Sequence, residues 1–193
     1  MTKSLQEIVH ALVPSSQKIP DTAVCGLTLD SNQVNKGDMF IAIPGIQVDG
    51  HDYIHQAIDS GASAIISNGR DVGDLPVPQI KVANPRRATS IVAAEYYGHP
   101  TKHLTVIGIT GTNGKTTSAS LLTSILTQAG YKTAQLGTLG LNADGFDQQA
   151  TLTTPDAISL QKTFSDLRNA DFSHIVMEVS SHALDQYRVA DVD

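Results

Sequence analysis

The sequence predicts an α/β fold with two consecutive domains, and three observations lead to this prediction. Short apolar runs alternate with helix-like segments in residues 39–98, and the alternation restarts at residue 104. A glycine-rich segment then joins a predicted strand directly to a predicted helix. Strands that alternate with helices are typical of a parallel sheet covered by helices.

The first predicted domain covers residues 1–100. An N-terminal helix is expected from apolar residues at helical spacing, namely Leu5, Ile8, Val9 and Leu12. Buried strands are predicted at residues 39–43, 62–67 and 78–83. Helices are predicted between and after them at residues 53–61 and 85–98, each ended by a glycine. The Gly- and Pro-containing segment 98–103 then marks a domain boundary.

The second predicted domain covers residues 101–193. Strands are predicted at residues 104–109, 131–138 and 174–180, with a helix at 116–130 whose apolar face holds Leu122, Ile125, Leu126 and Ala129. A further helix is expected to begin with Thr154 as N-cap, Pro155 at the first helical position and Asp156 in the first turn. Strands and helices in this order favour a parallel sheet.

Composition limits the possible classes of protein. The chain has 193 residues, 40% hydrophobic and 17% charged, enough for one sizeable core or two small ones. Its net charge of -6 is spread along the chain, so no nucleic acid is expected as a partner. Neither a signal peptide nor a bilayer-spanning apolar run is present, which indicates a cytoplasmic protein with no membrane partner. The single cysteine, Cys25, is predicted to be buried in a reducing compartment.

The segment GITGTNGKTT, residues 108–117, has the chemistry of a phosphate-binding loop without its usual first glycine. The common pattern places that glycine where Ile109 stands, whereas here glycines occupy positions 108 and 111. The segment still joins an apolar strand to an amphipathic helix, whose N-terminus attracts anions. Lys115 can reach terminal phosphates, and the Thr116 hydroxyl can bind Mg²⁺. The alternative is a glycine-rich turn without a ligand.

The spelling GTNGKTT resembles the ATP loop of the Mur ligase superfamily. The segments LTLDSNQVNKGDMFIAIPG and DGHDYIHQAIDSGA are similar to the uridine-binding domain of the MurE type, which adds the third residue of the peptide. TTPDA and MEVSSHALDQYRV are similar to its central-domain motifs. The resemblance covers nearly the whole chain and implies a uridine-nucleotide-binding domain followed by the first part of a P-loop ATPase domain.

The resemblance also implies site residues. ATP would be bound by Gly111, Thr112, Asn113, Gly114, Lys115, Thr116 and Thr117, with Lys115 catalytic. Mg²⁺ would be bound by Thr116 and Glu178. The uridine diphosphate part of the substrate would contact Leu29, Ser31, Ile46, Gln47 and Val48, and its muramyl dipeptide part Thr153, Thr154, Ser180, Gln186 and Arg188. Leu152 departs from the family, in which an asparagine often stands there.

The implied reaction joins a diamino acid to UDP-N-acetylmuramoyl-L-alanyl-D-glutamate through an acyl phosphate made from ATP. Family members continue into a longer central domain and a C-terminal domain, so the chain is expected to be part of a ligase and inactive alone. The sequence does not distinguish diaminopimelate from lysine, although the first is preferred, and it indicates no oligomeric state. Two alternatives stay open: another amide ligase such as a folylpolyglutamate synthase, and a UDP-nucleotide-binding module without catalysis.

Three histidines are further candidates. His51 and His55 have the i, i+4 spacing of a helical metal pair, but no third ligand is evident, so an exposed helix face is predicted. Ser180 and His182 suggest a hydrolase, yet the segment lacks the strand-to-helix elbow that a nucleophilic serine requires.

Overall fold

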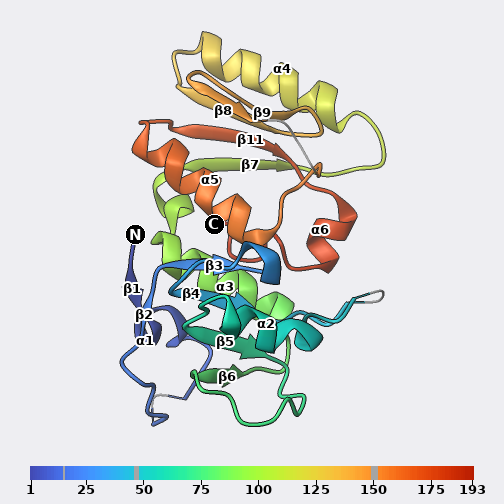
Figure 1. Cartoon of the computed structure of the whole chain (residues 1–193). Coiled ribbons are helices and arrows are strands. Elements are labelled where there is room, and N and C mark those ends of the chain that lie inside the picture. Colours follow the sequence, from blue (N-terminus) through green and yellow to red (C-terminus); the bar gives the residue numbers. More distant parts are fainter. Residues whose placement is uncertain (15, 46–47, 149–151) are drawn as a thin grey trace. The chain divides into compact units, whose positions relative to one another are not determined.

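The computed structural model describes residues 1–14, 16–45, 48–148 and 152–193. The chain divides into two compact units, here called the N-terminal unit (Met1–Tyr96) and the C-terminal unit (Tyr97–Asp193). Each contains a sheet whose principal strands are parallel, which confirms the α/β fold class (Figure 1).

The N-terminal unit is built on a four-stranded parallel sheet in the order β3-β4-β5-β6. Its strands are β1 (Lys3–Ser4), β2 (Ala23–Val24), β3 (Gly26–Thr28), β4 (Asp38–Ile41), β5 (Ala64–Ser67) and β6 (Gln79–Lys81). Its helices are α1 (Leu5–Val9), η1 (Ser31–Gln33), η2 (Gly50–Tyr53), α2 (Ile54–Asp59) and α3 (Pro85–Tyr97). Apolar residues of α2, β4 and β5 share one core, in which Ile54, Phe40 and Ile65 are fully or almost fully buried.

The helix predicted over residues 53–61 is present as α2, directly after η2, and Gly61 follows the helix end with a φ of 107° that favours glycine. One prediction for this unit needs correction. Cys25 is exposed and not buried, because it lies at the break between the short strands β2 and β3. Its apolar neighbours in the sequence are therefore a poor guide to its environment.

The C-terminal unit is built on a five-stranded sheet in the order β10-β9-β8-β11-β7. Its strands are β7 (Thr105–Ile109), β8 (Thr133–Gly137), β9 (Gly140–Ala143), β10 (Phe146–Gln148) and β11 (His174–Glu178). Its helices are η3 (Pro100–His103), α4 (Lys115–Gln128), α5 (Ala157–Asn169) and α6 (Ser181–Asp185). Strands β7, β11 and β8 are parallel, whereas β9 and β10 extend the sheet as an antiparallel hairpin.

The connections of this sheet place its two long helices on opposite faces (Figure 1). The chain passes from β7 through α4 to β8, forms the β9–β10 hairpin, and then returns through α5 to β11, which lies between β8 and β7. Since such crossovers are right-handed, a reversal of direction moves the second helix to the other face. The carboxyl ends of β7, β8 and β11 thus lie at one edge, where open α/β sheets bind ligands.

The two helices differ from their predictions in detail. In α4 only Ala119 is buried, and Ile125, predicted on the apolar face, is 63% exposed. The α5 helix begins two residues later than predicted, with Asp156 as N-cap and its carboxylate accepting from the N–H groups of Ile158 and Ser159. A carboxylate is a strong N-cap because it also complements the helix dipole. Thr154 is thereby free for other contacts.

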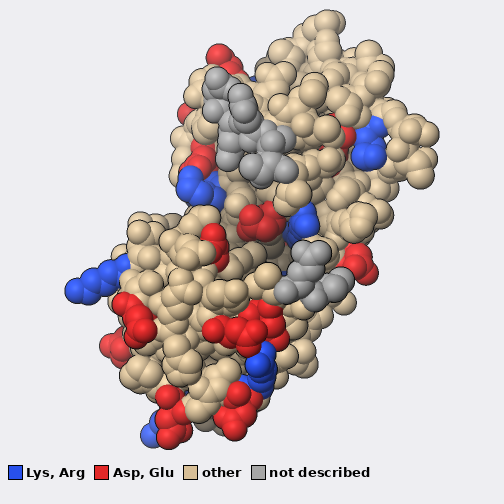
Figure 2. Space-filling model, turned by 45° about the vertical axis from the view of Figure 1, so that its right-hand side comes forward, with Lys and Arg blue, Asp and Glu red and all other residues tan. Residues whose placement is uncertain are grey.

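The surface agrees with the mixed charge of the sequence. On the face drawn in Figure 2, the Lys and Arg side chains lie apart from one another, among Asp and Glu. Among the described residues, no helix is long and apolar enough to cross a membrane.

Candidate functional site

The predicted phosphate-binding segment has the expected strand, loop and helix geometry. Strand β7 ends at Ile109 and helix α4 begins at Lys115. Between them, Gly111 and Gly114 have φ angles of 147° and 79°, in the region that favours glycine. The ammonium group of Lys115 donates to the carbonyl oxygen of Gly111 at 2.7 Å, so the lysine folds back over the loop. This arrangement directs a positive charge and a helix N-terminus to the same place.

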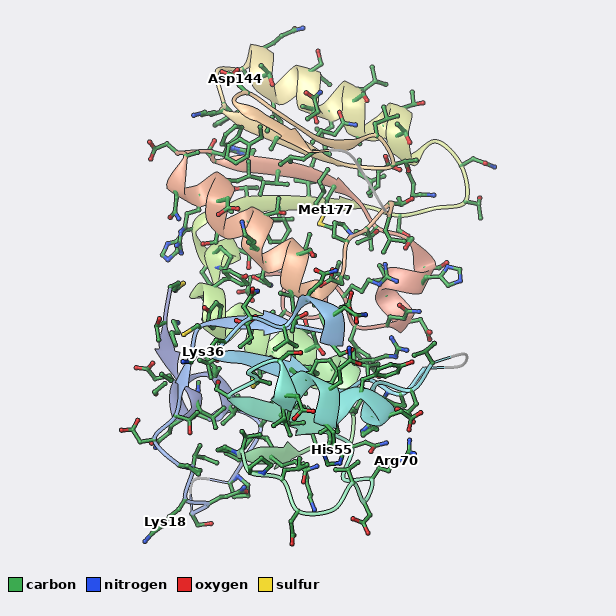
Figure 3. All side chains as sticks on the ribbon, viewed as in Figure 1. Lys18, Lys36, His55, Arg70, Asp144 and Met177 are labelled. Atoms are coloured by element: carbon green, nitrogen blue, oxygen red, sulfur yellow. The ribbon has the colours of Figure 1, made fainter. Side chains whose placement is uncertain are left out.

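The carboxylate of Glu178 lies at the carboxyl end of β11, one residue after Met177, which is labelled in Figure 3. Glu178 is only 1% exposed. One carboxylate oxygen accepts from the Thr116 hydroxyl at 3.1 Å, which joins the strand to the first turn of α4. The two residues predicted to bind Mg²⁺ are therefore in direct contact.

Thr138 is a site residue that the sequence interpretation missed. Its backbone N–H and its hydroxyl both donate to the Glu178 carboxylate, at 3.1 and 3.2 Å. Its hydroxyl also lies 3.2 Å from that of Thr153, which must then be the donor in that pair. The sequence does contain a signal for Thr138, because it directly follows β8 and a polar residue at the carboxyl end of a parallel strand is a site candidate.

The surroundings of Glu178 fit a hard divalent cation. Its hydrogen bonds to described residues come from neutral groups, so a buried negative charge remains to be balanced. Carboxylate and hydroxyl oxygens are ligands that Mg²⁺ accepts, together with water and substrate phosphates. Within the described ranges, no three His, Cys, Asp or Glu side chains form a metal cluster.

The residues predicted to contact the dipeptide lie in one hydrogen-bonded group next to Glu178. The Thr154 hydroxyl donates to the backbone carbonyl of Glu178 at 3.0 Å and accepts from the N–H of Ser180 at 3.1 Å. Arg188 donates to the Thr154 carbonyl at 2.8 Å and to the amide oxygen of Gln186 at 2.7 Å. The Arg188 guanidinium group is thus fixed in place by Thr154 and Gln186. Thr153 is linked to Glu178 through the hydroxyl of Thr138.

Leu152, Ser180 and His182, which the sequence interpretation also discussed, lie near this group. Leu152 is 48% exposed. The hydroxyl of Ser180 caps α6 by accepting from the N–H of Ala183, and His182 is exposed. Contrary to the sequence interpretation, Ser180 does lie between a strand, β11, and a helix, α6. Its φ of -79° is ordinary extended backbone, however, and its hydroxyl is engaged in the cap, so the segment is not the strained elbow of a nucleophilic serine.

A separate pocket of about 300 Å³ lies in the N-terminal unit, at the carboxyl ends of β3 and β4. It brings together Leu29, Ser31 and Val48, three of the residues predicted to contact the uridine part. Ile46 and Gln47 lie outside the described residues. The pocket is also lined by residues that the sequence interpretation did not select, namely Asp30, Asn32, Phe40, Ile43, Gly50 and Tyr53.

The structure corrects the prediction for His51. Its side chain is buried, and only His55 lies on an exposed helix face. Ring atom Nδ1 of His51 lies 2.6 Å from the Asp49 carboxylate, while Nε2 accepts from the backbone N–H of Asn68 at 3.1 Å. These contacts, which a sequence pattern cannot reveal, fix His51 as the tautomer protonated at Nδ1.

Asp49 supports a prediction about acid stability. The His51 backbone N–H is the largest cause that lowers the pKa of Asp49 below its ordinary value of 3.8, and the His51 ring and Arg70 act in the same direction. A carboxyl group with a lowered pKa contributes stability above its unfolded pKa and loses it as pH falls through the folded pKa. We therefore expect the melting temperature to decrease as the pH is lowered below about 3.8. The decrease should be less steep in Asp49→Asn. Asp59→Asn, at an exposed position of α2, serves as the control; equal slopes for Asp49→Asn and the unaltered chain would contradict the prediction.

Comparison with known proteins agrees with this geometry. A family model described as Mur ligase middle domain matches residues 109–193, and one described as Mur ligase family, catalytic domain matches residues 23–97. The chain belongs to the Mur ligase family. Each of the two units is thus matched by a Mur ligase family model.

Two curated relatives share the name UDP-N-acetylmuramoyl-L-alanyl-D-glutamate--2,6-diaminopimelate ligase. The protein of Bacillus licheniformis is 41% identical over 193 residues, 100% of this chain and 39% of its own length. That of Oceanobacillus iheyensis is 41% identical over 176 residues, 91% of this chain and 36% of its own. The chain thus spans well under half the length of the curated relatives that it matches.

Solved structures of Mur ligases share the fold. A structure with the same ligase name has a TM-score of 0.79 and 28% identity, covering 99% of this chain and 38% of the other. MurF from Acinetobacter baumannii has a TM-score of 0.65 and 23% identity, covering 94% of this chain and 36% of the other. The second likeness concerns the fold alone.

Proposed function

We propose that the chain forms the nucleotide-substrate-binding and ATP-binding parts of a cytoplasmic amide ligase of peptidoglycan precursor synthesis. The ligase adds diaminopimelate to UDP-N-acetylmuramoyl-L-alanyl-D-glutamate and consumes ATP with Mg²⁺. Residues 1–100 form the uridine-nucleotide domain and residues 101–193 the beginning of the ATP domain. The observation that supports this most directly is the hydrogen-bonded group that connects Thr116, Glu178 and Thr138 to the predicted dipeptide residues. The shared name of the relatives favours diaminopimelate over lysine.

The proposed mechanism assigns separate tasks to the residues at the sheet edge. A substrate carboxylate is a poor electrophile, so the γ-phosphoryl group of ATP is transferred to it and ADP is released. The amine then attacks the acyl phosphate, expels inorganic phosphate and loses a proton to give the amide. The loop 111–117 holds the phosphates, and Lys115 places its charge against the transferred group. Glu178 and Thr116 would hold Mg²⁺, which would neutralise phosphate charge. Thr154, Ser180, Gln186 and Arg188 orient the dipeptide, since positioning supplies much of such catalysis.

The pocket in the N-terminal unit is proposed to bind the uridine diphosphate part through Leu29, Ser31 and Val48, together with Ile46 and Gln47. Its apolar and polar lining suits a base and a ribose, because ligand pockets combine apolar walls with a few directed polar groups.

Titration calorimetry with three ligands tests the proposal. We expect the chain to bind UDP-N-acetylmuramoyl-L-alanyl-D-glutamate and Mg·ATP, but not folate. Binding of folate without binding of the uridine nucleotide would instead favour a folylpolyglutamate synthase. Binding of the uridine nucleotide without ATP would favour a binding module that has no catalytic role.

Arg188→Ala tests the dipeptide part of the site. A charge-assisted hydrogen bond contributes about 1.5–3 kcal/mol, so the affinity for the muramyl dipeptide nucleotide should fall by roughly 10- to 100-fold. The affinity for UDP alone should stay unchanged, because UDP has no dipeptide. Arg188→Lys should not restore binding, since lysine lacks the planar fork of donors. Equal losses for both ligands would indicate a general structural role of Arg188.

A further inference from the structure

The wall of the uridine pocket is attached to the neighbouring strand by a buried histidine. Residues Val48, Gly50 and Tyr53 line the pocket and belong to one short segment around η2. His51 lies within this segment but is only 2% exposed and does not line the pocket. Its ring therefore points away from the ligand space, into the protein.

The ring of His51 makes two contacts that connect different parts of the chain. Through Nδ1 it holds Asp49, the N-cap of η2, at 2.6 Å. Through Nε2 it accepts from the N–H of Asn68, the first residue after β5. A neutral imidazole protonated at Nδ1 can make both contacts at once, as one donor and one acceptor. The pocket wall and the loop after β5 are thus fixed to each other.

Two further features hold the same segment. Arg70, labelled in Figure 3, contacts Asp49 at 3.0 Å and Asp52 at 2.9 Å, from the same loop that follows β5. A Cβ atom on Gly50 would lie 2.8 Å from the backbone nitrogen of Ile43, so this part of the wall packs directly on the chain after β4. The surface ion pairs are partly exposed and contribute little, so the buried ring is the principal side-chain connection between this segment and the loop after β5, beside the backbone hydrogen bond from Gly50 to Ile43.

We propose that His51 is a positioning residue for uridine nucleotide binding, acting through its two ring contacts and not by touching the ligand. The inference rests on the proposed function of this pocket. A preorganised wall loses less conformational freedom when a ligand binds, so release of the segment should weaken binding even where the ligand contacts themselves are intact.

The test uses the whole chain, UDP as the probe, and four variants. His51→Phe keeps a ring and removes both contacts; His51→Asn can retain only the contact with Asp49, and His51→Gln only that with Asn68. We expect UDP affinity to fall about tenfold or more in His51→Phe, the loss that accompanies one charge-assisted hydrogen bond, and less in the other two. The control His55→Phe changes an exposed histidine four residues away, whose ring lies 3.1 Å from the carbonyl oxygen of Val72, outside the pocket lining, and it should bind UDP normally.

Two additional measurements separate positioning from general stability. Affinity for Mg·ATP should be unchanged in all four variants, because the loop 111–117 belongs to the C-terminal unit. The ¹⁵N spectrum of the ring in the unaltered chain should show protonation at Nδ1 only. Unchanged UDP affinity in His51→Phe would overturn this inference but not the proposed function. If that variant does not fold, unchanged affinity in both His51→Asn and His51→Gln would have the same meaning. Absence of UDP binding by the unaltered chain would overturn the proposed function as well.

Discussion

Replacing Gly137 with alanine is expected to abolish the effect of Mg²⁺ on ATP binding. Gly137 is the last residue of β8, beside the buried carboxylate of Glu178. A Cβ atom at this position would lie 2.7 Å from both Cγ and Cδ of Glu178, closer than real contacts allow. The carboxylate would have to move, and its contacts with Thr116 and Thr138 would be lost together.

The measurement is ATP affinity with and without Mg²⁺, in the unaltered chain and in the variant. We expect Mg²⁺ to strengthen ATP binding in the first and to have no effect in the second. Overpacking of this kind also costs about 1–3 kcal/mol of stability, so a thermal melt accompanies each titration. Gly108→Ala in β7 is the matched control, because its Cβ would meet only a methyl group of Val179, at 3.2 Å. A Mg²⁺ effect that persists in Gly137→Ala would remove Glu178 from the proposed metal site.

The sequence predicted the parallel strands and the glycine-rich loop because these features have local signals. Apolar runs identified β4, β5, β7 and β11, and Gly111 and Gly114 identified the loop between strand and helix. The β9–β10 hairpin also has a local signal in the sequence. Asp144, labelled in Figure 3, and Gly145 form an Asp-Gly pair between the two strands, a pair typical of tight hairpin turns.

The contacts that complete the candidate sites were not predictable in this way, because they join residues far apart in the chain. Thr138 contacts Glu178 across 40 positions of the sequence, and His51 contacts Asn68 across 17. Thr154 was expected to cap α5, yet Asp156 caps it and Thr154 contacts Glu178 instead. Local preferences do not decide between two possible partners of a threonine when the second partner comes from a neighbouring strand.

Lys115→Ala is expected to weaken ATP binding by about 10- to 100-fold. The ammonium group donates to the Gly111 carbonyl at 2.7 Å, so it lies over the loop that is proposed to hold the phosphates. Loss of a charge-assisted hydrogen bond to a phosphate oxygen corresponds to about 1.5–3 kcal/mol. The fold should be unaffected, because the removed contact lies in an exposed loop.

A series of ligands locates the effect of Lys115 along the nucleotide. If the ammonium group acts on the terminal phosphates, the variant should lose affinity for ATP and for tripolyphosphate, which has no nucleoside, and should bind AMP as the unaltered chain does. Lys102→Ala, at an exposed position of η3 in the same unit, controls for the general loss of one positive charge. Equal losses for ATP and AMP would indicate that Lys115 acts through the shape of the loop. Unchanged affinity for both ATP and tripolyphosphate would exclude Lys115 from phosphate binding, because a point charge at hydrogen-bond distance from a phosphate cannot be removed without a measurable cost.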